Sequence, residues 1–165
     1  MYTAPMPTDR ISATRRIGAS AADIFALVTD PTMHVAIDGS HMLELAPDAR
    51  QLTAVGDSFV IDMDRDALGD IPMGKYSVLN IVTRITPNTL FEWNVGSAER
   101  GPLGHVYGYE LSAVNDHETD VTSYCNWSAV SDQIRERVTF PIVPKMALIT
   151  TLEKLDRLAT QPRSI

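Results

Sequence analysis

The last apolar segment of the chain has the periodicity of an amphipathic helix. Between Lys145 and Ala159 the apolar side chains recur every three or four residues and share one face, while charged side chains occupy much of the opposite face. A helix of about 15 residues is about 22 Å long, which is enough to cross a sheet obliquely. The pattern predicts one long C-terminal helix that packs its apolar face against the rest of the chain.

Most of the sequence before this helix alternates between apolar and polar residues, as strands with one solvated face do. In the segment 58–64, Phe59, Ile61 and Met63 share one face and polar residues share the other. A short strand is also predicted before the turn at Pro47. The remaining strand-like segments, each bounded by turn residues, are 10–18, 75–85, 89–95, 105–114 and 119–129. Strands at this close spacing predict an antiparallel meander.

Two short helices are predicted between the first strand and the rest of the sheet. Ser20 stands at an N-cap position, and Asp23 three residues later completes a capping box for a helix that ends near Val28. Pro31 suits the first turn of a second short helix over residues 31–37. A strand, two short helices, several strands and a long helix define the α+β class.

Length and charge limit the possible partners. The chain has 165 residues and a net charge of −7, which disfavours nucleic acid and anionic membrane surfaces as partners. Cys125 is the single cysteine, so no intrachain disulfide can form, and no apolar run reaches the ~20 residues of a membrane span. We expect a cytoplasmic monomer or homodimer without integral membrane association. Residues 10–160 should form one domain, between a flexible N-terminal arm (1–9) and a C-terminal tail (161–165).

Four segments resemble the START-like superfamily, whose helix-grip fold is shared by lipid-transfer domains, plant pathogenesis-related ligand binders and bacterial polyketide cyclase/dehydrases. They read SAADIFALVTDP, ITPNTLFEW, YELSAVNDHETDVTSYCNW and FPIVPKMALITTLEKLDRLA. The resemblance implies a curved antiparallel sheet of about six or seven strands wrapped on a long C-terminal helix, with a cavity between them. Two departures are Glu118–Asp120, where the family usually has Gly-Thr-Arg, and the prolines at 141 and 144.

The residues predicted to face this cavity are aromatic or aliphatic, with a few hydroxyl and indole donors, as small-molecule pockets are. In the strand 75–85 we take the odd-numbered positions as inward, because Asn80 and Arg84 would be costly inside. The candidate ligand-binding residues are Phe59, Ile61, Met63, Leu79, Ile81, Phe91, Trp93, Tyr107, Tyr109, Trp127, Ile142 and Met146. The same side chains could instead form a solid core.

Candidate chemistry is sparse. His34 and Tyr107 are the acid–base candidates, because imidazole titrates near neutral pH and a phenol can transfer a proton. His34, Asp38 and His41 have the spacing of a facial metal site. Gly39 interrupts the helix between them, however, so histidines on a loop near the cavity mouth are the preferred interpretation. No metal and no cofactor is expected.

Two function hypotheses from different classes follow from these patterns. The first is the binding of a small hydrophobic, partly oxygenated molecule, such as a polyketide, lipid or sterol-like compound, with or without cyclase/dehydrase activity. The alternative is a protein-interaction module that has a filled core and acts through an exposed face. An open cavity lined by the aromatic residues favours the first hypothesis, and a solid core favours the second.

Overall fold

The computed structural model describes residues 9–161, so most of the predicted arm and tail lie outside the described residues. Seven antiparallel strands form one sheet in the order β1-β7-β6-β5-β4-β3-β2. The strands are β1 (Arg10–Ile17), β2 (Leu43–Leu45), β3 (Ser58–Asp64), β4 (Lys75–Thr86), β5 (Leu90–Ser97), β6 (Gly101–Asn115) and β7 (Glu118–Asn126). The helices are α1 (Ala21–Val28), α2 (Pro31–Ile37), η1 (Arg65–Leu68), α3 (Asp132–Arg135) and α4 (Lys145–Thr160).

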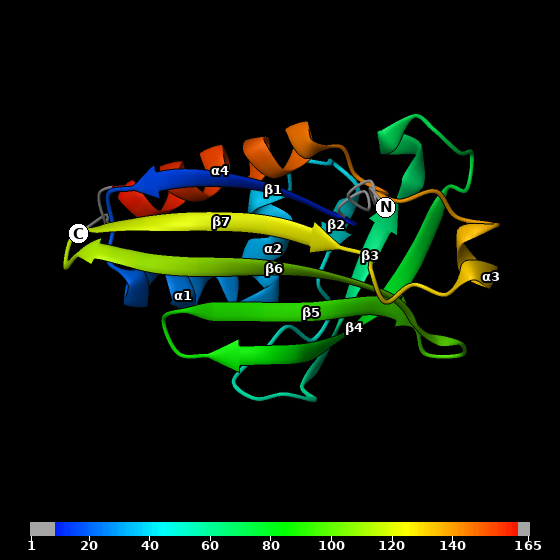
Figure 1. Ribbon diagram of the computed structural model, residues 1–165, viewed down its shortest axis with the longest axis horizontal. Helices are drawn as coiled ribbons and strands as arrows, with labels where there is room; N and C mark the ends of the chain where they lie inside the picture. Colours follow the sequence, from blue (N-terminus) through cyan, green and yellow to red (C-terminus); the bar gives the residue numbers. More distant parts are fainter. Residues whose placement is uncertain (1–8, 162–165) are drawn as a thin grey trace, which may run out of the picture.

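The sheet is curled, and the long helix α4 runs along its β1 edge while α1 and α2 lie behind it (Figure 1). The α4 helix contacts β1 and β7 on the sheet and α1 and α2 beside it. This arrangement is the predicted α+β class and confirms the predicted layout of one curved sheet, two short helices and a long C-terminal helix. No helix in residues 9–161 has the length and apolarity needed to cross a membrane.

Local signals start the short helices where the sequence predicts. The Ser20 side chain accepts a hydrogen bond from the Asp23 amide at 3.1 Å, which caps α1. Asp30 caps α2 by accepting from the Thr32 amide at 2.9 Å, and Pro31 occupies the first turn. Because α4 begins at Lys145, the two prolines at 141 and 144 precede the helix and do not kink it.

The core lies where α4 and the short helices meet the inner face of the sheet. On α4 the buried residues are Ala147, Leu148, Leu152 and Leu155. The end of α2 approaches α4 so closely that a Cβ on Gly39 would lie 2.2 Å from the Ala147 carbonyl oxygen. Glycine at this position therefore allows α2 to close one side of the space beneath α4.

The structure corrects the inward positions that the sequence predicts for strand β4. Tyr76, Val78 and Asn80 face the interior, so Leu79 and Ile81 lie on the opposite, outer face and their predicted orientation is wrong. Asn80 is tolerated inside because its side-chain amide donates to the Phe59 carbonyl at 3.4 Å. A register shift between Val82 and Arg84 then returns Ile85 to the inner face, as predicted.

Candidate functional site

A cavity of about 680 Å³ lies between the inner face of the sheet, α2, α4 and the segment that joins α3 to α4. Its apolar wall comes from four parts of the chain. These are Phe59, Ile61 and Met63 on β3; Trp93 and Val95 on β5; Leu103, Tyr107 and Tyr109 on β6; and Ile142, Val143, Ala147 and Leu148 at the start of α4 and just before it. A concave site of this size with an aromatic wall and few polar groups is typical of small-molecule binding sites.

Trp93 is the centre of the aromatic wall. Antiparallel pairing sets Trp93 of β5 directly opposite Tyr107 of β6, and their rings stack with centroids 6.0 Å apart. The other rings around Trp93 have centroids 4.8–6.3 Å away and are His34, Phe91, Tyr109 and Phe59. Interlocked aromatic rings fix one another's orientation, so this part of the wall is preformed.

The structure brings together most, but not all, of the candidate ligand-binding residues. Those that line the cavity are Phe59, Ile61, Met63, Trp93, Tyr107, Tyr109 and Ile142. Phe91 is fully buried in the core next to the cavity and does not reach it. Trp127 follows the end of β7 and packs in a separate small cluster with Cys125 and Val130.

Met146 does not reach the cavity either. Its side chain is 66% exposed, because the face of α4 that packs on the domain passes through the next two residues, Ala147 and Leu148. Successive helix residues differ by about 100° in direction, so a residue two positions before Leu148 lies well off that face.

His34 lines the cavity as a buried, neutral imidazole. Its Nε2 donates to the Val28 carbonyl at 2.6 Å. Burial lowers the pKa of His34 to about 4, although the Val28 carbonyl and the nearby Asp30 and Asp38 act in the opposite direction. Because Nε2 carries the proton that it donates, Nδ1 of the neutral ring is an acceptor.

The structure does not assemble His34, Asp38 and His41 into a metal site. The Asp38 carboxylate accepts from the Ser40 amide at 2.9 Å, the Ser40 hydroxyl at 2.7 Å and the Leu43 amide at 3.0 Å. His41 is exposed on the following loop. Over the described range 9–161, no group of three or more His, Cys, Asp or Glu residues is placed to hold a metal ion.

Tyr107 offers a neutral hydroxyl to the cavity. Burial is the main cause that raises its pKa well above the ordinary tyrosine value, and the neighbouring Cys125 thiol adds to the effect. Cys125 lies opposite Tyr107 on β7, and burial raises the pKa of the thiol to about 12. Both groups therefore stay protonated at neutral pH, so Tyr107 can donate a hydrogen bond and Cys125 is a poor nucleophile.

Several further polar residues line the cavity and were not among the candidates, and Arg65 and His105 are two of them. Arg65, 7% exposed, donates from Nε and Nη2 to Asp70 at 2.9 and 2.7 Å and lies at the η1 end of the cavity. His105, 1% exposed, precedes Tyr107 on the same face of β6. The strand alternation that selects Tyr107 and Tyr109 also points to His105, whereas nothing in the sequence places Arg65.

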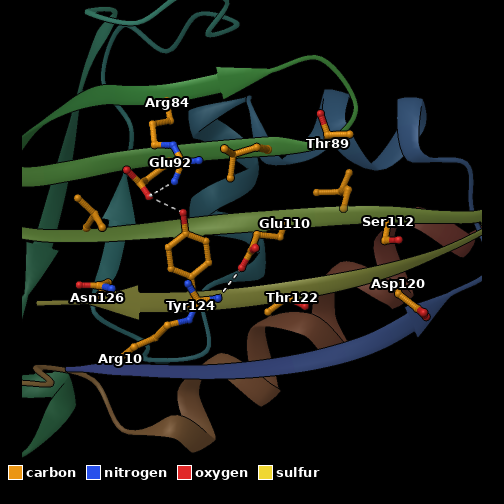
Figure 2. Close-up of a pocket in the computed structure, with 13 residues that line it drawn as sticks. Arg10, Arg84, Thr89, Glu92, Glu110, Ser112, Asp120, Thr122, Tyr124 and Asn126 are labelled. Carbon is orange, nitrogen blue, oxygen red and sulfur yellow. Dashed lines mark hydrogen bonds and ion pairs between the residues drawn. The ribbon is translucent and has the colours of Figure 1, made fainter. Parts of the chain in front are cut away.

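The outer face of the same sheet carries a polar depression (Figure 2). The Tyr124 hydroxyl donates to Glu92 at 2.5 Å, and Arg84 lies 3.7 Å from the same carboxylate. The Arg10 guanidinium lies 4.2 Å above the Tyr124 ring and forms an ion pair with Glu110. These groups are paired with one another across the five adjacent strands β1, β7, β6, β5 and β4. The depression is therefore a structural network.

Comparison with known proteins supports the fold without naming a function. No protein-family model matches the sequence. Over 120 residues the chain is 31% identical to the uncharacterized protein Rv0088 of Mycobacterium tuberculosis, which covers 73% of this chain and 48% of the relative. The chain thus spans about half the length of the curated relatives that it matches.

Solved structures resemble the whole described domain. Protein CV1439 of Chromobacterium violaceum has a TM-score of 0.63 and 13% identity, covering 93% of this chain and 99% of its own. Truncated norcoclaurine synthase of Thalictrum flavum has a TM-score of 0.60 and 15% identity, covering 99% and 100%. The chain therefore has the helix-grip fold of START-like and Bet v 1-like proteins. At such low identity this likeness concerns the fold alone.

Proposed function

We propose that this protein binds a small, largely apolar molecule with oxygen-containing groups in the cavity between the inner face of the sheet and α4. The observation that carries the proposal is the cavity itself, about 680 Å³ with a wall built around Trp93. Small-molecule sites occupy about 300–1,000 Å³, so a polyketide, lipid or sterol-like compound is within range. A protein-interaction module with a filled interior would not need this space.

Binding accounts for the site better than acid–base catalysis by His34. A general base works best when its pKa lies near the operating pH. Burial holds the pKa of His34 at about 4, and its Nε2 is already bonded to the Val28 carbonyl. Tyr107 keeps its proton at neutral pH and can orient an oxygen of the ligand as a hydrogen-bond donor. We therefore assign both residues to binding.

The first test is native mass spectrometry of the protein as purified, followed by solvent extraction and identification of any bound molecule. In parallel, binding of the neutral fluorescent probe N-phenyl-1-naphthylamine is titrated. Trp93→Ala should weaken probe binding about tenfold or more, because it removes the ring that the other aromatic side chains contact.

Met146→Ala is the matched control, because Met146 lies on α4 beside the cavity wall and is 66% exposed. Its probe affinity should equal that of the wild type, and circular dichroism should show both variants folded. Absence of probe binding to the wild type, or equal loss in both variants, would contradict the proposed function.

A further inference from the structure

The cavity wall contains a buried polar side-chain atom that has no partner among the described residues 9–161. His105 lines the cavity at the start of β6, next to the segment that joins α3 to α4. Its ring meets Tyr107 at a centroid distance of 5.5 Å and Phe140 at 5.0 Å, both edge-to-face. The side chain is 1% exposed, and Nδ1 has no hydrogen-bond partner among residues 9–161.

This is unusual for the described part of the chain. The only other fully buried side-chain nitrogen or oxygen atom in residues 9–161 that has no partner is Oδ1 of Asn94. Asn94 pairs in register with Ile81 and Val106, on the outer face, so its side chain points away from the cavity. His105 is therefore the one residue that combines a fully buried, unpartnered polar atom with a place in the cavity wall.

Three other polar side chains of the cavity wall are bonded within the protein. His34 bonds the Val28 carbonyl, Asn80 the Phe59 carbonyl, and Arg65 the Asp70 carboxylate. A buried polar atom without a partner costs free energy, and native proteins rarely leave one in place without a use for it. A ligand atom that bonds His105 would remove this cost, and the cost would return when the ligand leaves.

We propose that His105 is the polar anchor of the ligand, a proposal that rests on the proposed function. The ligand would carry a hydroxyl group at the end that lies against the α3–α4 segment. A hydroxyl suits either tautomer of the ring, since it can donate to a bare Nδ1 or accept from a protonated one. Burial lowers the pKa of His105 to about 4, so the ring is neutral at neutral pH and favours an uncharged partner. The apolar body of the ligand would then extend along Trp93.

The test compares two probes of equal size, 2-naphthol and 2-methylnaphthalene, by isothermal titration and by quenching of tryptophan fluorescence. The quantity compared is the ratio of the affinity for 2-naphthol to the affinity for 2-methylnaphthalene. This ratio should be higher in the wild type than in His105→Leu. The change in this ratio should be about fivefold, the effect of one hydrogen bond. His105→Gln, which keeps a polar group, should restore part of the preference.

Phe140→Leu is the matched control, because Phe140 packs against the same ring without a polar atom. It should change the affinities of both probes by similar factors. An unchanged ratio in His105→Leu would overturn the anchor while leaving the cavity-binding function intact. Failure of both probes to bind the wild type would contradict the cavity-binding function and, with it, the anchor.

A measurement on the wild type makes the test independent of any variant's folding. In nitrogen-15 NMR spectra of the imidazole, 2-naphthol should shift Nδ1 of His105 while 2-methylnaphthalene leaves it in place. Equal shifts with both probes would indicate mere proximity and would overturn the hydrogen bond.

Discussion

Two buried polar groups on opposite faces of strands β5 to β7, Glu92 and His105, differ in how they are satisfied. On the outer face Glu92, 8% exposed, accepts from the Tyr124 hydroxyl at 2.5 Å (Figure 2). It also accepts from the Thr83 hydroxyl at 2.8 Å. On the inner face His105 is buried more deeply and Nδ1 has no partner in residues 9–161. Polar groups satisfied within the protein stabilise the fold, whereas the unsatisfied Nδ1 of His105 is the atom that we propose a ligand bonds.

Gly108 shows how the two faces share one backbone. A Cβ at this position would lie 2.4 Å from the Tyr124 ring, so the glycine lets that ring lie flat across β6 and reach Glu92. The backbone of Gly108 also borders the cavity on the inner side. The outer network and the cavity wall are thus a strand's thickness apart, yet substitutions in them should have different consequences.

The largest expected effect is a loss of stability when the outer network is broken. Tyr124→Ala should lower the free energy of unfolding by about 4 kcal/mol, because it empties a buried aromatic site and removes one of the two hydroxyl donors to the Glu92 carboxylate. Urea denaturation measures the change. Affinity for the naphthylamine probe should be unaltered in the protein that remains folded.

Tyr124→Phe is the control for the ring itself. It removes the hydroxyl alone and should cost about 1.5–3 kcal/mol, the value of a hydrogen bond to a charged group. Equal losses for the two variants would mean that the ring contributes little. A loss of probe affinity in either variant would show that the two faces are coupled.

The second expected effect is a loss of stability in acid that comes from the inner face. Burial lowers the pKa of His34 and of His105 to about 4, against about 6.5 in the unfolded chain. The unfolded state therefore binds more protons between these values, so stability is full above pH 6.5 and is lost as the pH falls toward 4. Each histidine should account for about 3 kcal/mol of the loss.

Urea denaturation of His105→Gln between pH 7 and pH 4 tests this contribution. The variant should lose less stability over that interval than the wild type does, by about 3 kcal/mol. His117→Gln provides the matched control, since His117 is exposed in the turn between β6 and β7 and should leave the profile unchanged. Parallel profiles for the wild type and His105→Gln would show that burial does not shift His105.

The architecture could be predicted because its signals are local. The capping pair at Ser20 and Asp23, the alternation in β3 and the apolar face of α4 each depend on residues close together in sequence, and the structure confirms all of these elements. The presence of a cavity could be expected only from the resemblance. Alternation shows which side chains face inward but not how far the sheet stands from the helix.

The errors arose where a distant group decides the outcome. The cost of burying an amide predicts that Asn80 faces outward, but the Phe59 carbonyl, 21 residues away, accepts a hydrogen bond from it inside. Because of the register shift after Val82, Ile85 faces inward while Leu79 and Ile81 face outward. No residue type in this segment marks the shift, so the sequence alone could not give the orientation of the whole strand.

The smallest expected effect tests this corrected orientation of β4 and, with it, the distinction between the two faces. Val78→Phe should weaken binding of the naphthylamine probe about tenfold, because the larger side chain enters the cavity that Val78 lines. Ile81→Phe adds a ring three residues along the same strand but on the outer face, and it should leave probe affinity unchanged. Both variants are compared by fluorescence titration after circular dichroism shows that they are folded. The opposite result, in which Ile81→Phe blocks the probe and Val78→Phe does not, would contradict this orientation. Ile81 would then line the cavity in place of Val78.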